Sequence, residues 1–224
     1  MIDIRNCVYP SPAQMKMVIL GARNSFKSRA KSDSNSVIEQ DGCHLLMLGP
    51  EDNKLLMRLA KASPAEGKFL RMMHLIFDMK APLYFWKQFD TYKVGTTSNS
   101  ESTMHSLTKR HLVLEDFSIP VVNDETIEVW ESTLYLLNTL IDAYNYTKDK
   151  DTYDQLISFL PNGYMQMRTI DLDYQTLRAI YTQRKGHKLV EWKQFLDWIE
   201  KLPYAHLITD SIDLDDILKE DNNG

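Results

Sequence analysis

The sequence has little cysteine, since Cys7 and Cys43 are the only two among 224 residues. Two cysteines exclude the multi-bridge framework of small secreted proteins. Neither stands in the Cys/His spacing of a zinc site, so we expect no metal centre. We interpret both cysteines as ordinary free thiols.

Long apolar runs are also missing. No stretch approaches the roughly 18 uninterrupted apolar residues of a transmembrane helix. The N-terminal MIDIRNCVYP carries charged residues where a signal peptide needs an apolar segment. We therefore expect a cytoplasmic protein with no membrane partner. A net charge of −5 gives no general excess of positive charge, and we expect no nucleic-acid partner.

The composition is that of a globular protein, with 43% hydrophobic and 25% charged residues. A chain of this length can bury a sizeable core. We expect one domain over residues 1–224, with an acidic and frayed tail from about residue 210.

Local patterns predict an α+β domain with a helix-rich C-terminal half. In the first half we expect a short strand at 1–8, a helix at 11–26 with Ser11 as cap and Pro12 at its first position, a Ser-rich loop at 27–42 and a helix at 51–62. The run FLRMMHLIFDM fits either a strand or a helix, and we favour a strand at 72–79. His74 in this run is interpreted as a core histidine.

The remaining elements are predicted to be helices. We expect them at 83–90, 133–146, 172–183 and 189–202, with an acidic polar linker and an LPNG turn after the second.

The most informative stretch is residues 81–105, APLYFWKQFDTYKVGTTSNSESTMH. Here an apolar segment passes directly into closely spaced hydroxyl and amide side chains. Such a set suits a ligand that carries a phosphate and a hydrogen-bonding base. The alternative for residues 98–106 is a Ser-rich surface loop, because Ser, Thr and Asn readily bond the local backbone.

This stretch resembles the signature region of the flavin-dependent thymidylate synthase (ThyX) family. That family has an apolar lead-in with a glutamine, an Arg-His-Arg triplet and a polar run ending Asn-Glu-x-Ser-x-Arg-Tyr. The matching positions, with one inserted residue, are Gln88 for the glutamine, Thr91-Tyr92-Lys93 for the triplet, Asn99 for the asparagine, Glu101 or Ser100 for the glutamate, and Ser102 for the serine.

Other stretches are similar to the family in order and spacing. Residues 22–26 resemble its Ala-Arg-x-Ser segment, and Lys80-Ala81-Pro82 its Lys-Ala-Pro. Leu160-Pro161 and the helix that ends at Arg184 resemble its C-terminal half.

The resemblance implies a curved sheet flanked by helices and a homotetramer. It also implies reductive methylation of dUMP to dTMP, with methylenetetrahydrofolate as the carbon donor and FAD, reduced by NADPH, as the hydride donor.

The resemblance further implies roles for individual residues. The catalytic positions are Ser102 and Arg184. The cofactor-binding positions are Arg71, Thr91, Tyr92, Lys93, Asn99 and Glu101. The substrate-binding positions are Gln88, Ser100, Ser102, Thr103 and Arg184.

Two departures from the family pattern leave alternatives open. The triplet keeps one cation, and Met104 stands where the family has arginine. A lysine does not reproduce the bidentate fork of arginine. Lys87, Lys93, Lys109 and Arg110 are candidates to compensate. The first alternative is a non-redox pyrimidine-nucleotide-binding or scaffold protein, and the second is a different pyrimidine-nucleotide transferase.

Overall fold

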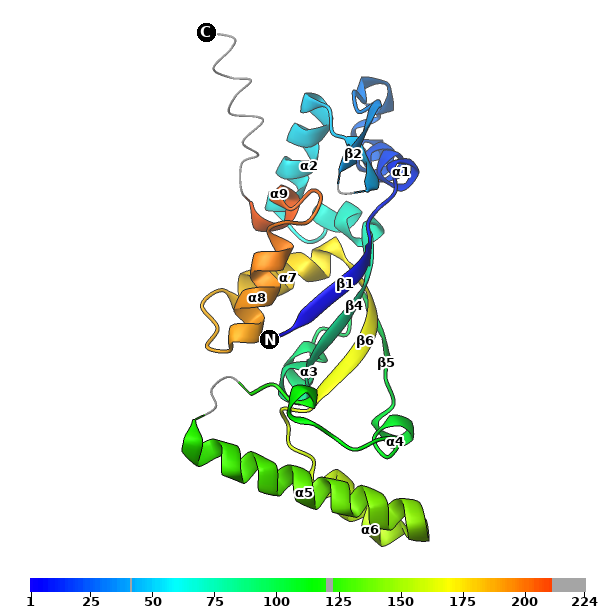
Figure 1. Cartoon of the computed structure of the whole chain (residues 1–224). Helices are drawn as coiled ribbons and strands as arrows, with labels where there is room; N and C mark the ends of the chain where they lie inside the picture. The colour runs from blue at the N-terminus through cyan, green and yellow to red at the C-terminus, as the bar shows by residue number, and fades with distance from the viewer. Residues whose placement is uncertain (41, 120–122, 211–224) are drawn as a thin grey trace. The chain divides into compact units, whose positions relative to one another are not determined.

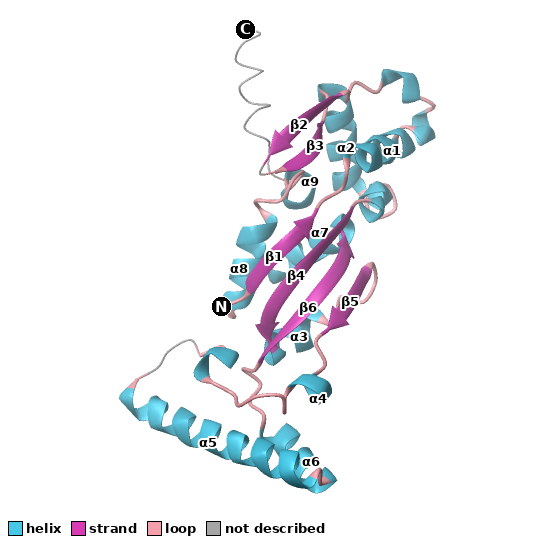
Figure 2. Cartoon of the chain, turned by 45° about the vertical axis from the view of Figure 1, so that its right-hand side comes forward, coloured by secondary structure: helices cyan, strands magenta, loops and turns pink. Residues whose placement is uncertain are grey.

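The larger sheet of the protein has four strands in the order β1-β4-β6-β5, and β2 and β3 form a separate pair (Figure 2). The computed structural model describes residues 1–40, 42–119 and 123–210. Neighbouring arrows of the larger sheet point in opposite directions in Figure 2. The strands are β1 (Asp3–Val8), β2 (Ser36–Gln40), β3 (Cys43–Met47), β4 (His74–Pro82), β5 (Thr96–Ser100) and β6 (Met165–Asp173). The predicted α+β class, with a sheet and flanking helices, is confirmed.

The chain forms two compact units. Unit 1 comprises residues 1–5, 78–91 and the described residues of 98–169. Unit 2 comprises the described residues of 6–77, residues 92–97, and the described residues from 170 onward. A single domain over 1–224 stays a prediction. The expected frayed tail lies almost entirely outside the described residues.

Strand β4 alternates strictly between its two faces. Leu75, Phe77 and Met79 are fully buried, whereas His74 and Ile76 are exposed. In unit 2, Phe77 packs against Phe195 and Trp198, with ring centroids 6.3 and 4.7 Å away. The predicted strand at 72–79 is confirmed in type, but it begins two residues later and extends to Pro82.

The interpretation of His74 as a core histidine is wrong. Its side chain is 46% exposed, and its Nδ1 lies 2.9 Å from Asp171 Oδ1. The reason is the period of two along β4, which places His74 on the face opposite to Leu75 and Phe77.

In unit 1 the longest helix packs against its successor. Helix α5 (Asp124–Thr147) lies beside α6 (Lys150–Phe159), as Figure 1 shows. Leu137, Ile141 and Leu156 are among the buried residues of their shared core. The unit also contains α3 (Leu83–Phe89), α4 (Thr103–Ser106) and the 3-10 turn η4 (Leu114–Asp116).

Two predictions in this unit need correction. The helix expected at 133–146 is only the second part of α5, which begins after the Asn123 cap. The expected polar linker is wrong, because it contains α6. Asp149 caps that helix by accepting a hydrogen bond from Thr152 N at 2.8 Å, and Leu156 anchors it in the core.

Unit 2 contains most of the other helices. They are α1 (Pro12–Ala22), α2 (Pro50–Ala62), α7 (Tyr174–Arg184), α8 (Val190–Ile199) and α9 (His206–Thr209), with 3-10 turns η1 (Asn24–Phe26), η2 (Arg29–Lys31) and η3 (Gly67–Met72). The predicted Ser11 cap is confirmed, since its Oγ accepts from Gln14 N at 3.2 Å. Among the described residues, no helix has the length and apolar character needed to cross a membrane.

Two further predictions are wrong in part. The expected loop at 27–42 includes β2, all of whose side chains are exposed, so no alternation marked it as a strand. The helix expected from Leu172 begins at Tyr174, because Leu172 and Asp173 end β6. Asp173 caps α7 by accepting a hydrogen bond from Thr176 N at 2.7 Å.

A buried carboxylate fastens the N-terminal part of unit 2. Asp52 Oδ1 accepts a hydrogen bond from Arg23 Nε at 2.5 Å, and Oδ2 accepts from the hydroxyls of Ser32 and Ser34 at 2.9 and 2.7 Å. Burial alone would raise the pKa of Asp52, but the hydrogen bonds from Ser34, Arg23 and Ser32 outweigh it and lower the pKa from 3.8 to about 2.

Candidate functional site

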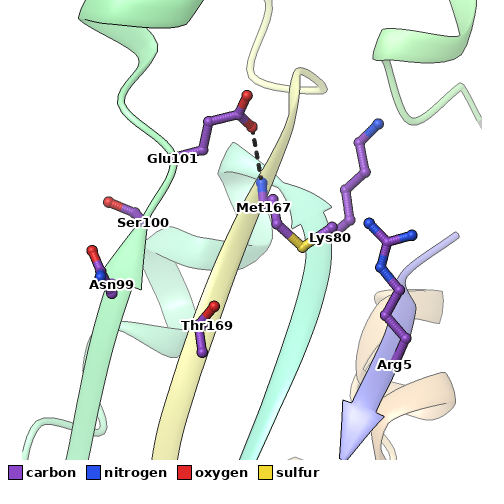
Figure 3. A pocket seen from close by; sticks show the side chains of 7 residues that line it. All are labelled: Arg5, Lys80, Asn99, Ser100, Glu101, Met167 and Thr169. Atoms are coloured by element: carbon purple, nitrogen blue, oxygen red, sulfur yellow. Dashed lines mark hydrogen bonds between the residues drawn. The ribbon is translucent and has the colours of Figure 1, made fainter.

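The outward face of unit 1 contains a cavity of about 540 Å³, which is in the range of small-ligand sites. Four strands contribute to it, as Figure 3 shows. The lining residues are Arg5 from β1, Lys80 from β4, Asn99 and Ser100 from β5, Glu101 just after β5, and Met167 and Thr169 from β6.

The polar stretch reaches this cavity because its end is tied to β6. Glu101 N donates to Met167 O at 2.9 Å, and Gln166 Nε2 donates to Glu101 O at 2.9 Å. Gln166 O in turn accepts from the buried indole of Trp86 at 3.1 Å, which joins α3 to the same strand. The alternative of a surface loop at 98–106 is therefore wrong in part, since the segment contains the end of β5 and all of α4.

The cavity carries two cations and one carboxylate. Within the described part of the chain, the side chains of Arg5 and Lys80 make no hydrogen bond or close ion pair. Glu101 Oε2 accepts a hydrogen bond from Met167 N at 3.4 Å. Two cations beside amide and hydroxyl groups fit an anionic ligand that also forms hydrogen bonds, such as a phosphorylated nucleotide. The same donors fit the phosphates of FAD.

Of the predicted residues, Asn99, Ser100 and Glu101 are brought together here. Arg5 and Lys80 were not predicted as site residues. The available signal was the alternation of His74, Ile76, Asp78 and Lys80, which places Lys80 on the outward face of its strand. Nothing local links Arg5 to residues 99–101, because the order of the strands alone brings them to one sheet.

Other predicted residues of unit 1 do not line the cavity. Thr91 Oγ1 donates to Gln88 O at 2.7 Å, just after α3. Ser102 is at the N-cap position of α4 without a capping bond from its side chain, and its carbonyl accepts from Ser106 Oγ at 2.7 Å. Thr103 Oγ1 accepts a long hydrogen bond of 3.4 Å from Gln166 Nε2.

Unit 2 brings together two other predicted residues, Tyr92 and Arg184. Arg184 Nε donates to Tyr92 Oη at 2.8 Å, and Tyr92 Oη donates to Gln183 Oε1 at 3.1 Å. The Arg184 guanidinium also lies 4.5 Å from the ring centroid of Trp192 and 5.3 Å from that of Tyr92. These contacts fix the arginine at the end of α7.

The last two predicted residues, Arg71 and Lys93, also belong to unit 2. Arg71 Nε donates to Gln175 Oε1 at 2.8 Å. Lys93 is exposed.

Two cations considered as substitutes for the family's arginines already have partners. Lys87 donates to Asn162 Oδ1 at 3.0 Å. Arg110 holds both carboxylate oxygens of Asp116, at 2.7 and 2.5 Å. Burial alone would raise the pKa of Asp116, but bonds from Arg110 and from Val113 N lower it, and Arg110 thereby has a structural role. The described residues include no group of three His, Cys, Asp or Glu side chains placed to hold a metal ion.

The arrangement of strands and helices is that of the flavin-dependent thymidylate synthases, so the fold predicted from the resemblance is confirmed. A ThyX from Helicobacter pylori solved with FAD and dUMP has a TM-score of 0.66 and 16% identity, over 95% of this chain and 99% of that one. The UMP/dUMP methylase PolB from Streptomyces cacaoi, solved with 5-Br dUMP, has a TM-score of 0.57 and 12% identity, over 89% and 88% of the two chains. By sequence, no family model and no curated protein matches the chain.

Proposed function

We propose that this protein methylates dUMP to dTMP as a divergent flavin-dependent thymidylate synthase. The observation that carries the proposal is the cavity of unit 1, where Asn99, Ser100 and Glu101 lie beside two cations. The same fold in a dUMP-bound ThyX and in a dUMP methylase supports it. Reductive methylation takes a one-carbon unit from methylenetetrahydrofolate and a hydride, which bound FAD supplies after reduction by NADPH.

The residues of this chain have binding and positioning roles in the proposal. By the resemblance, Asn99 and Glu101 contact the flavin and Ser100 contacts the nucleotide, and the polar groups of all three line the cavity. Arg184 contacts the nucleotide with a guanidinium that Tyr92 helps to orient.

Further assignments follow from the resemblance alone. We propose that Gln88, Ser102 and Thr103 contribute to nucleotide binding, with Ser102 close to the reaction, and that Arg71 and the triplet Thr91-Tyr92-Lys93 lie near the flavin. We also propose a cytoplasmic homotetramer.

The test is a titration of the purified protein with FAD, followed by an assay for dTMP. We expect saturable binding with perturbed flavin absorption bands, and dTMP formation that requires dUMP, methylenetetrahydrofolate and NADPH together. An FAD-loaded protein that consumes NADPH but makes no dTMP under these conditions would contradict the proposed reaction.

One observation favours a second candidate, a nucleotide-binding protein without redox chemistry. Two of the three triplet positions have polar groups engaged within the chain, since Thr91 donates to Gln88 O and Tyr92 bonds Arg184 and Gln183. The polar groups of these two positions are thus already used within the chain, and Lys93 is the one cation of the triplet. Binding of dUMP without binding of FAD at high micromolar concentration would favour this candidate.

A further inference from the structure

We propose that Arg5 and Lys80 are the anion-binding residues of the cavity and hold a nucleotide phosphate there. They would replace cations that the Thr91-Tyr92-Lys93 triplet lacks. The inference rests on the proposed function and names the residues that anchor its ligand. The recognised chemistry is a phosphate group, either the monoester of dUMP or the pyrophosphate of FAD.

The side chains of Arg5 and Lys80 lack the close partners that Arg168 and Arg110 have in the same unit. Arg168 is paired with Asp90 at 2.6 Å and stacks over Trp86 at 4.3 Å, and Arg110 is paired with Asp116. Among the described residues, Arg5 has no such contact, and Lys80 has only a longer-range attraction to Asp116. Both still line the same cavity.

Arg5 and Lys80 also favour an anion electrostatically. They come from neighbouring strands and line the same cavity. An anion bound there is attracted by both cations. Arg5 adds the planar fork that grips phosphate oxygens in pairs, while Lys80 adds a point charge.

Charge is distributed unevenly across the cavity. In Figure 3, Arg5 and Lys80 lie on one side, Asn99, Ser100 and Glu101 lie on the other, and β6 runs between them. The Glu101 carboxylate repels a phosphate on its own side and accepts hydrogen bonds from a base or a sugar hydroxyl. This distribution of charge orients a bound nucleotide, with its phosphate toward β1 and β4 and the rest of the molecule toward β5.

The test is isothermal titration of the 224-residue protein with dUMP, deoxyuridine, FAD and riboflavin. The variants are Arg5→Gln, Lys80→Gln and the double variant. The control is Arg29→Gln/Lys54→Gln, which removes one arginine and one lysine from exposed positions outside the cavity. Arg5→Lys keeps the charge and loses the fork. Circular dichroism establishes that each variant is folded.

We expect each glutamine variant to raise the dissociation constant of the phosphate-bearing ligand about tenfold to a hundredfold. This is the loss expected when a charge-assisted hydrogen bond is removed. Arg5→Lys should recover part of the loss. Ligands without phosphate should bind the variants and the wild type equally. If the variants lose affinity for dUMP only, the bound phosphate is the monoester of dUMP. If they lose affinity for FAD only, it is the pyrophosphate of FAD.

The inference is overturned if R5Q/K80Q binds dUMP and FAD as tightly as the control, or if the wild type binds neither. If the double variant binds normally and the wild type makes dTMP, the inference is wrong and the proposed function stands. If binding depends on Arg5 and Lys80 but no dTMP forms, the proposed function is wrong and the inference stands.

Discussion

At the scale of single residues, Arg184 is held by aromatic rings and a phenol. Its Nε–H donates a hydrogen bond to Tyr92 Oη, and its guanidinium plane lies over the Trp192 ring. In the family pattern that Thr91-Tyr92-Lys93 resembles, the middle position is a histidine. Tyrosine there supplies both an acceptor for the guanidinium and a ring beneath it, so a departure from the pattern has become a positioning contact.

The contact predicts energetic coupling between the two side chains. Tyr92→Phe removes the acceptor and Arg184→Lys removes the donor and the planar fork. Each should lower the free energy of unfolding by about 1 kcal/mol, and the double variant should cost clearly less than their sum. Urea denaturation measures all three, with the exposed Tyr146→Phe as control. Additive costs would show that the hydrogen bond does not couple them.

Asp52 predicts an acid-sensitive component of stability. Because its folded pKa of about 2 lies below its ordinary 3.8, this carboxylate stabilises the fold fully above about pH 4. The contribution, about 2 kcal/mol, is lost as pH falls from about 4 to about 2.

Asp52→Asn should remove this component and leave the buried Arg23 cation without its partner charge. We expect Asp52→Asn to lower the free energy of unfolding by about 3–5 kcal/mol at neutral pH. Its stability should also vary less between pH 4 and pH 2 than that of the wild type. Chemical denaturation at a series of pH values measures both effects, with the exposed Asp197→Asn as control. Equal acid dependence in Asp52→Asn and the wild type would show that another group is responsible.

At the scale of elements, the approach to β5 is set by contact with the start of α7. Gly95 O accepts from Asp173 N at 3.1 Å, and Val94 O accepts from Thr176 Oγ1 at 2.9 Å. Gly95 has φ +74, and a Cβ there would lie 2.8 Å from Thr176 Oγ1 and closer still to the Asp173 carboxylate. This position needs glycine both for its backbone conformation and for space.

Gly95→Ala should therefore lower the free energy of unfolding by about 2 kcal/mol or more. Gly42→Ala is the matched control, because Gly42 has φ +76 and no atom within 4 Å of the added Cβ. The difference between the two variants in urea denaturation isolates the clash at the α7 cap. Equal costs would mean that backbone strain alone makes Gly95 necessary.

Sequence patterns predicted elements well where one face is continuously apolar and poorly where it is not. Helix α8 was predicted because Trp192, Phe195 and Ile199 recur at helical spacing and are all buried. Helix α6 was missed because it buries only Leu156, while its other apolar residues Ile157 and Phe159 are exposed, so no continuous apolar face marks it. Strand β6 was missed because its nine residues mix exposed, half-buried and buried positions without a clear period.

At the scale of the whole molecule, the resemblance predicted the fold, and local composition predicted only part of the candidate site. Asn99, Ser100 and Glu101 are contiguous, so their shared position could be anticipated. Arg5 and Lys80 come from strands that are far apart in the sequence. No local sequence pattern predicts the strand order that brings these two residues together.

Hydrogen-bonded neighbours in the larger sheet are all distant in the sequence, which makes formation of the sheet a late event during synthesis. Strand β4 ends at Pro82 and its neighbour β6 begins only at Met165. A ribosome adding about 5–20 residues per second needs on the order of 10 s to bridge that gap, during which β4 has one unpaired edge. Non-local pairing of this kind also slows folding. Arg5 and Asn99 are thus synthesised early, and of the two strands that lie between theirs in the sheet, β6 is synthesised last.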